Sequence, residues 1–181
     1  ADPADDNDGI PDTEEDKLGT SSTNSDSDQD KISDKKDAFP LNPTEQIDTD
    51  RDKIGNNTDT DDDNDGIPDK KDPFPLNKPP IIRLTDSDFS IDLLNQSNFD
   101  ATPSFDSDGR IVSYKWEIDD QPLKEGNSLN HIFRELGGHK VKLTVTDDAG
   151  ESASQEFQVT VFNIGLYKQI GISLFAILLA L

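Results

Sequence analysis

The stretch that decides the fold of the first half of the chain reads Asp61-Asp62-Asp63-Asn64-Asp65-Gly66-Ile67-Pro68-Asp69-Lys70-Lys71-Asp72. Counted from Asp61, acidic residues occupy positions one, three, five, nine and twelve, and Gly66 occupies position six. Alternate carboxylates on a tightly turned loop direct their oxygens toward one centre, as a hard cation with about six to eight oxygen ligands requires. Glycine allows the sharp turn, and we expect the backbone carbonyl of Ile67 to be a further ligand. The pattern therefore predicts a calcium site.

The same pattern recurs, which argues against the alternative interpretation of a disordered acidic run. The second loop runs from Asp26 to Asp37 and the third from Asp48 to Asp59, while a first loop, Ala4 to Glu15, has alanine in place of the first carboxylate. We refer to these as the first to fourth loops in chain order. The predicted metal ligands are Asp6, Asp8, Ile10, Asp12 and Glu15; Asp26, Asp28, Asp30, Ile32, Asp34 and Asp37; Asp48, Asp50, Asp52, Ile54, Asn56 and Asp59; and Asp61, Asp63, Asp65, Ile67, Asp69 and Asp72.

Residues 2–77 resemble bacterial thrombospondin type 3 repeats, whose unit is D-x-D-x-D-G-x-x-D-x-x-D. The resemblance implies a calcium-wrapped rod with little regular secondary structure. Lys31 and Lys53 depart from it, because they stand at position six, where a left-handed lysine costs about 1 kcal/mol. EF-hands and dockerins fit less well, because a helix follows each of their loops and Pro73 and Pro75 come directly after Asp72.

The composition supports a first half that is held together by cations. The chain has a net charge of −22 and is only 30% hydrophobic. Residues 1–78 hold 24 acidic against 9 basic residues, a net charge of −15. Such a segment cannot build a hydrophobic core, and its acidity argues against a nucleic-acid partner. The chain has no cysteine, so disulfides do not replace the core.

A second domain follows Pro79 and Pro80, where the composition changes to short stretches of alternating hydrophobic and polar residues. We expect strands at residues 81–84, 89–93, 97–101, 111–118, 140–146 and 155–161. Turns are expected at 106–109, 125–127, 137–138 and 147–150. Short strands at this spacing predict a β-sandwich. The residues expected in its core or on the surface next to the core are Val112, Tyr114, Trp116, Phe133, Val141, Leu143, Val145, Phe157 and Val159.

Residues 79–163 resemble a PKD domain, an immunoglobulin-like sandwich. The likeness lies in residues 99–116 and 138–150, although the run Trp116-Glu-Ile-Asp-Asp-Gln121 replaces the family's W-D-F-G-D-G. Asp106 and Asp108 can stabilise a turn or bind a cation, and we favour the turn. With no cysteine nearby, His131 and His139 do not predict a zinc site.

The last segment, residues 164–181, is continuously apolar from Ile170 onward. These 12 residues are fewer than the roughly 20 that a membrane span needs. We interpret them as part of a transmembrane helix, with Tyr167 and Lys168 at the interface. A buried strand or a core helix is the alternative.

The sequence thus predicts a mostly β chain with three parts: calcium-binding repeats at 1–78, a sandwich at 79–163 and a C-terminal transmembrane helix at 164–181. No catalytic motif such as G-x-S-x-G or H-E-x-x-H is present, so we expect no enzyme. Our first hypothesis is a calcium-binding surface stalk or adhesion protein that its tail tethers to a membrane. The alternatives are accessory modules of a secreted hydrolase and a structural subunit of a surface filament or layer. Expected partners are a membrane and another protein or a surface glycan. The expected location is extracellular, at the cell surface or periplasmic, where calcium is plentiful.

Overall fold

The computed structural model describes residues 6–85 and 89–165. The chain divides into two compact units, Ala1–Lys78 and Pro79–Leu181. We describe each unit by itself.

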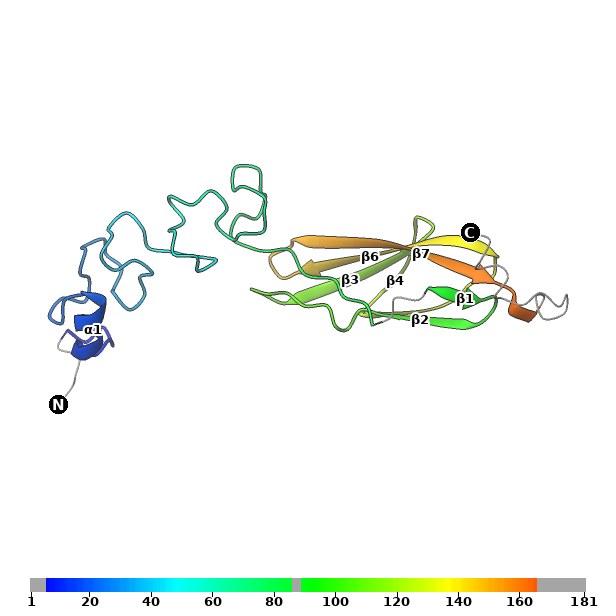
Figure 1. The fold of residues 1–181 in the computed structure, drawn as a ribbon, viewed down its shortest axis with the longest axis horizontal. Coiled ribbons are helices and arrows are strands. Elements are labelled where there is room, and N and C mark those ends of the chain that lie inside the picture. Colours follow the sequence, from blue (N-terminus) through cyan, green and yellow to red (C-terminus); the bar gives the residue numbers. More distant parts are fainter. Residues whose placement is uncertain (1–5, 86–88, 166–181) are drawn as a thin grey trace, which may run out of the picture. The chain divides into compact units, whose positions relative to one another are not determined.

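The first unit consists of loops and one helix among its described residues, α1 (Asp12–Leu18), as Figure 1 shows. Acidic side chains in the first turn of α1 interact favourably with the positive end of the helix dipole. Gly19, at φ 83°, ends the helix in the left-handed conformation. The resemblance to repeats with little regular secondary structure did not anticipate this helix. The first loop therefore runs into a helix, whereas the other three loops end on single turns.

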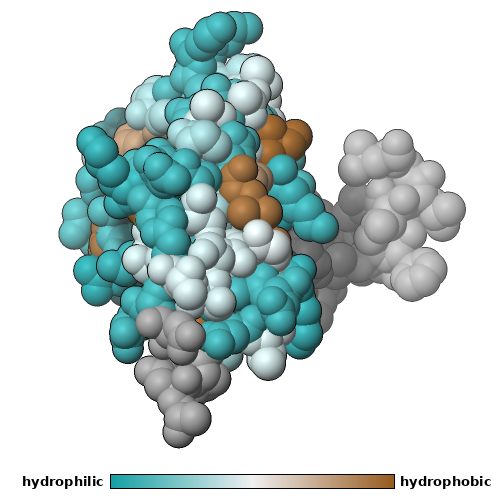
Figure 2. All heavy atoms as spheres, turned by 90° about the vertical axis from the view of Figure 1, so that its left-hand side faces the viewer, coloured by the Kyte–Doolittle hydropathy of each residue, from teal (hydrophilic) through white to brown (hydrophobic). Residues whose placement is uncertain are grey.

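The buried residues of the first unit are mainly acidic. Ile10 is the only buried hydrophobic side chain among described residues 6–78. In the same range five acidic residues are buried: Glu15, Asp34, Asp37, Glu45 and Asp63. On the face drawn in Figure 2, hydrophobic residues form small separate groups among hydrophilic ones. The first unit is therefore not organised by a hydrophobic core.

The second unit contains two sheets. The larger sheet has the order β1 (Ser90–Asp92), β7 (Ser152–Phe162), β6 (Gly137–Asp147), β3 (Ile111–Ile118) and β4 (Gln121–Glu125). The smaller sheet pairs β2 (Gln96–Asp100) with β5 (Ser128–Ile132). All pairs are antiparallel except β1 with β7. Figure 1 shows this arrangement, which confirms the predicted mostly β, immunoglobulin-like architecture.

The core lies between the two sheets. It consists of Phe99, Ala101, Trp116, Ile118, Leu129, Phe133, Val141, Leu143, Val145, Val159 and Val161, with Tyr114 and Phe157 partly buried against it. The prediction was wrong for Val112, which is 57% exposed. The register of β3 against β6 shifts between Ile111 and Ser113, and this bulge breaks the alternation that pointed Val112 inward.

The strand predictions were incomplete. Strands β4 and β5 were missed because their polar sequences show little alternation, and Pro122 is tolerated in β4 because β4 is an edge strand. The expected strand at 81–84 is reduced to one bridge, Ile81 with Phe105. Gly137 and Gly138 open β6 rather than forming a turn.

The predicted transmembrane segment lies almost entirely outside the described residues, which end at residue 165. Within the described ranges, the structure contains no helix with the length and hydrophobicity that a membrane crossing requires.

Candidate metal centres

Three of the four loops bring three carboxylates to one point. In each of these loops, one carboxylate oxygen from each of three residues lies within 4.8 Å of the other two. The three residues are Asp26, Asp28 and Asp30 in the second loop, Asp48, Asp50 and Asp52 in the third, and Asp61, Asp63 and Asp65 in the fourth. These are positions one, three and five of each loop. The first loop, with Ala4 at position one, forms no such triad among its described residues.

The carboxylates are held by backbone N–H groups of their own loop. The N–H of position seven donates to the carboxylate of position five in all four loops, at 2.6 Å for Ile10, 2.8 Å for Ile32, 2.7 Å for Ile54 and 2.7 Å for Ile67. The N–H of position five likewise donates to position three, at 2.9–3.1 Å. In the second to fourth loops the N–H of position six donates to position one. Each loop is therefore a fixed frame around its acidic side chains.

This frame requires two left-handed residues in each loop, at positions four and six. Position four has φ between 59° and 69° at Asn7, Gln29, Arg51 and Asn64. Position six is glycine in the first and fourth loops, but it is Lys31 (φ 85°) and Lys53 (φ 78°) in the second and third. Since L-residues other than glycine resist this conformation, the backbone strain expected from the sequence is present at both lysines.

One oxygen of several carboxylates is left without a hydrogen bond inside the loops. The buried oxygens that lack a hydrogen-bond partner in the described part of the chain include Oδ2 of Asp6, Asp8, Asp28, Asp30 and Asp63, and Oδ1 of Asp48 and Asp61. At position twelve, the oxygens that are buried without a hydrogen-bond partner in the described part of the chain are Oδ2 of Asp37, Oδ2 of Asp72 and both oxygens of Glu15. The other oxygen of Asp37 and of Asp72, Oδ1, accepts a hydrogen bond from the N–H of Phe39 and of Phe74, respectively. Most of the unsatisfied side-chain oxygens of the first unit thus come from the ligand positions, and Thr20, Glu45 and Asp62 supply the others within residues 6–78.

The carboxyl groups at several ligand positions are buried close to other carboxylates, and both effects raise their pKa. Burial and the charges of Asp6 and Asp8 raise the pKa of Glu15. Burial, with Asp30 and Asp28 nearby, likewise raises the pKa of Asp37. Burial also raises the pKa of Asp63, to which Asp65, Asp72 and Asp61 contribute. Position twelve therefore lies close to position three in three loops, and close to position five as well in the first and second loops.

Position nine is hydrogen-bonded to position two in the second to fourth loops. Asp34 accepts the N–H and the hydroxyl of Ser27, Asn56 accepts the N–H of Thr49, and Asp69 accepts the N–H of Asp62, at 2.7–3.1 Å. These contacts bind position nine to position two, and position nine is not part of the triads. Asp12, the equivalent residue of the first loop, opens α1.

The residues fit a hard divalent cation. Buried carboxylates without a partner are unfavourable, and so are like charges held a few Å apart. A calcium ion would supply the opposite charge to oxygens that already converge, and oxygen is the ligand that calcium prefers. The residues at positions one, three, five and twelve would hold it.

Asp62, which lies between two ligand positions, is half-buried, and its Oδ1 lacks a hydrogen-bond partner among the described residues. Burial and the charges of Asp69 and Asp59 raise its pKa. This burial could not be predicted from the sequence, because the residue type at position two varies among the four loops.

Asp106 in the second unit has a similar environment. Both of its carboxylate oxygens are buried without a hydrogen-bond partner in the described ranges, and burial together with Asp108 raises its pKa. Oδ1 of Asp148 lies near the same turn, since a Cβ on Gly109 would meet Asp106 and Asp148. Carboxylate oxygens of Asp106 and Asp148 therefore come close together at this turn, and both the hydrogen-bonded turn and the cation site stay predictions.

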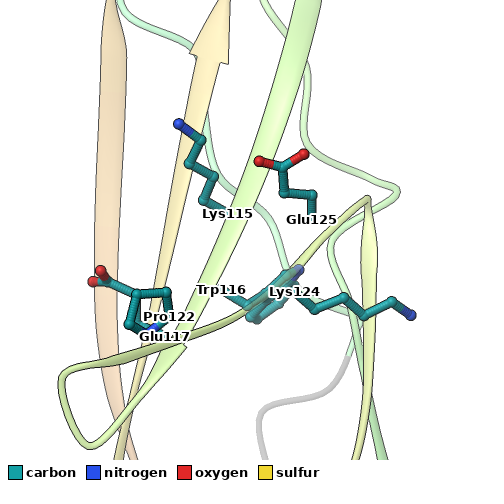
Figure 3. Close-up of a pocket in the computed structure, with 6 residues that line it drawn as sticks. All are labelled: Lys115, Trp116, Glu117, Pro122, Lys124 and Glu125. Carbon is teal, nitrogen blue, oxygen red and sulfur yellow. The ribbon is translucent and has the colours of Figure 1, made fainter.

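Two further features of the second unit are the contacts of His139 and a hollow between β3 and β4. His139 is engaged at both ring nitrogens, by Asp119 at 2.8 Å and by the carbonyl of Glu135 at 3.1 Å. The hollow in Figure 3 is lined by residues of β3 and β4, with Lys124 pointing away from Lys115. Its lining holds no serine, cysteine or histidine, and Trp116 at its base is 1% exposed.

Comparison with known proteins identifies the second unit. Residues 77–161 match the family model of the PKD domain. These residues form a PKD domain. The collagenase ColA of Clostridium perfringens is 35% identical over 75 residues, which cover 41% of this chain and 7% of the relative. The pre-pro-metalloprotease PrtV of Vibrio cholerae is 45% identical over 47 residues, or 26% of this chain and 5% of the relative.

A solved structure of the first PKD domain of Vibrio cholerae PrtV shares 29% identity, with a TM-score of 0.37. The likeness covers 46% of this chain and 96% of that one. The chain spans less than a tenth of the length of the curated relatives named above. The match to the family model confirms the predicted PKD domain, while the likeness of residues 2–77 to thrombospondin repeats stays a prediction.

Proposed function

We propose that this chain is a non-catalytic accessory region of an exported protease, in which calcium-filled loops form an ordered spacer beside a PKD domain. The observation that carries the proposal is the PKD domain's similarity to segments of a collagenase and of a metalloprotease. The acidic loops support calcium as the spacer's structural element, because their buried oxygens converge without partners in the described part of the chain.

The proposed extracellular location agrees with the calcium concentration that such loops need. Loops of this kind outside cells bind calcium at roughly 10⁻⁴–10⁻³ M. Such concentrations are found outside cells, so an extracellular location would keep the loops filled. The curated relatives favour this hypothesis over a surface stalk or a filament subunit. Tethering through residues 164–181 remains a prediction, since these residues lie almost wholly outside the described ranges.

The partner of the PKD domain would be the macromolecular substrate of the protease or a surface glycan near it. An accessory domain adds binding at a second point and so raises the effective concentration of the catalytic domain on a large substrate. A small substrate offers no second point. The proposed role therefore predicts different effects on large and small substrates.

The test compares the complete gene product with a version that lacks residues 1–163. We expect equal cleavage of a short peptide and slower cleavage of an insoluble protein substrate by the shortened version. A third version carries Asp28→Ala, Asp50→Ala and Asp63→Ala, which keep the chain length and remove one predicted ligand from each of three loops. A complete product without protease activity, or equal rates on the insoluble substrate, would contradict the proposal.

A further inference from the structure

The third and fourth loops are joined in a way that the other loops are not. A single residue, Thr60, separates Asp59 from Asp61, whereas residues 16–25 and 38–47 separate the earlier loops. Asn64 at position four of the fourth loop donates its side-chain amide to Oδ2 of Asp50 in the third, at 2.6 Å. The first and second loops are also in contact, but there Lys35 donates to the backbone carbonyl of Gly9, at 2.8 Å, and not to a predicted ligand.

The oxygen that Asn64 contacts is a cation-facing one by comparison with the other loops. At position three, Oδ1 accepts the N–H of position five in all four loops. The other oxygen, Oδ2, is buried without a partner in Asp6, Asp28 and Asp63, within the described ranges. In Asp50 alone among these residues Oδ2 receives a hydrogen bond, and the donor belongs to the next loop. A carboxylate oxygen has a second lone pair, so Oδ2 of Asp50 can accept this hydrogen bond and ligate a cation at the same time.

A second contact has the same direction, with its donor in the fourth loop and its acceptor in the third. Oδ1 of Asp59, the last ligand position of the third loop, accepts the N–H of Thr60 at 2.6 Å and of Asp61 at 3.1 Å. Asp61 is the first ligand position of the fourth loop. In the second and fourth loops the equivalent bond goes to Phe39 and Phe74, which are not ligands. Two hydrogen bonds therefore connect the loops, and the bond from Asp61 to Asp59 joins two predicted ligand positions.

The fourth loop is better prepared to bind than the third. It has Gly66 at position six, and Asp63 in its triad is 1% exposed. The third loop has Arg51 and Lys53 in left-handed conformations, and Asp52 in its triad is exposed. The weaker loop thus receives its extra hydrogen bond from the stronger one.

We propose that Asn64 is a positioning residue that makes cation binding by the third loop depend on occupancy of the fourth. The inference rests on the proposed function, because it takes calcium as the ligand of both loops. When the fourth loop closes on its ion, Asn64 is fixed at φ 59° and holds Asp50 Oδ2 toward the third loop's ion. Hydrogen bonds to metal-ligating groups change metal affinity by about 10–100-fold when removed. Since Asn64 is exposed, we expect the lower end of this range.

The experiment is a calorimetric calcium titration of the full chain carrying Asp8→Ala and Asp28→Ala, so that the third and fourth loops dominate the signal. We expect two steps in this parent. Asn64→Gly keeps the left-handed backbone and removes the amide, and it should weaken the second step about tenfold while leaving the first unchanged. In Asp65→Ala, which disables the fourth loop, the remaining step should be weaker by the same factor, and adding Asn64→Gly should weaken it no further. This lack of additivity is the readout that a merely structural role would not produce.

Asn7→Gly is the matched control. Asn7 occupies the same loop position at φ 62°, is exposed like Asn64, and its side chain shows no hydrogen bond among the described residues. It should leave both steps unchanged. Equal effects of Asn64→Gly and Asn7→Gly, or additive losses with Asp65→Ala, would overturn the coupling while leaving calcium binding intact. If the chain without substitutions bound no calcium, the proposed function would fail and the coupling with it.

Discussion

At the scale of single residues, the loops combine well-placed ligands with strained backbone. Lys31 and Lys53 occupy positions that glycine fills in the first and fourth loops, and all four residues have positive φ. The N–H of each lysine is still used, because it donates to position one of its loop. The strain therefore accompanies the loop fold and is not relieved by a different conformation.

Lys31→Gly should strengthen the second loop. Glycine adopts positive φ without the steric penalty, so the change should favour the calcium-bound loop by about 1 kcal/mol. The measurement is the calcium affinity of the full chain by calorimetry. Lys36→Gly is the control, because Lys36 lies in the same loop, is exposed and has no positive φ. It should weaken binding slightly, and equal behaviour of the two variants would contradict the strain argument.

His139 and Asp119 make the stability of the PKD domain depend on pH. The hydrogen bond to Asp119 raises the pKa of His139 above its ordinary value, and the same bond lowers the pKa of Asp119. A raised histidine pKa gives stability that is complete below about pH 6.5 and is lost as the pH rises through the folded-state pKa. His139→Gln should therefore destabilise the domain more at pH 5.5 than at pH 8.5. Urea unfolding followed by fluorescence of Trp116, the only tryptophan, measures this.

His131 provides the control of opposite sign. Burial and the nearby His139 lower its pKa, so its protonation opposes folding in acid. His131→Gln should destabilise the domain less at pH 5.5 than at pH 8.5. The same pH trend for both variants would show that the Asp119 contact does not govern the effect.

At the scale of elements, the sequence predicts what depends on local spacing and misses what depends on contacts between segments. The triads follow from alternation of Asp residues, and β3 follows from its period of two. The contact of Asn64 with Asp50 could not be predicted, because it joins residues of two loops that lie 14 positions apart. Strands β4 and β5 were missed for the same reason: pairing partners, and not their own polar residues, make them strands.

The bulge in β3 leads to a prediction on the PKD core. Val145 in β6 is 0% exposed and Val112 in β3 is 57% exposed. Val145→Ala should lower the free energy of unfolding by roughly 2 kcal/mol, through lost burial and the cavity that remains. Val112→Ala should change it by less than about 0.5 kcal/mol. Urea unfolding of the two variants measures both, and equal losses would mean that Val112 is a core residue after all.

One loop should correspond to one bound ion. Asp65→Ala removes position five of the fourth loop, whose carboxylate also accepts the N–H of Ile67. The number of calcium ions bound at saturation should fall by one in calorimetry. Asp62 is unsuitable as a control because it is half-buried among other carboxylates. Asp16→Ala in α1 makes the same charge change at an exposed position, and a similar loss there would indicate that overall charge controls binding.

At the scale of the whole molecule, the two units are stabilised by different forces. The first unit buries acids and one isoleucine within residues 6–78, while the PKD domain buries a cluster of aliphatic and aromatic side chains. Without cations, the converging carboxylates of the first unit repel one another, and no hydrophobic core opposes the repulsion. Hydrophobic burial does not depend on calcium. The two units should therefore respond differently to its removal.

The most direct test of this account is hydrogen exchange of the full chain, followed by mass spectrometry, in calcium and in chelator. With calcium, the N–H groups of positions five, six and seven should be protected, because each donates to a carboxylate of its loop. In chelator, residues 6–78 should exchange at the rate of an unfolded chain, while strands β3, β6 and β7 keep their protection. If the loops were equally protected in chelator, calcium would not be what holds the first unit together.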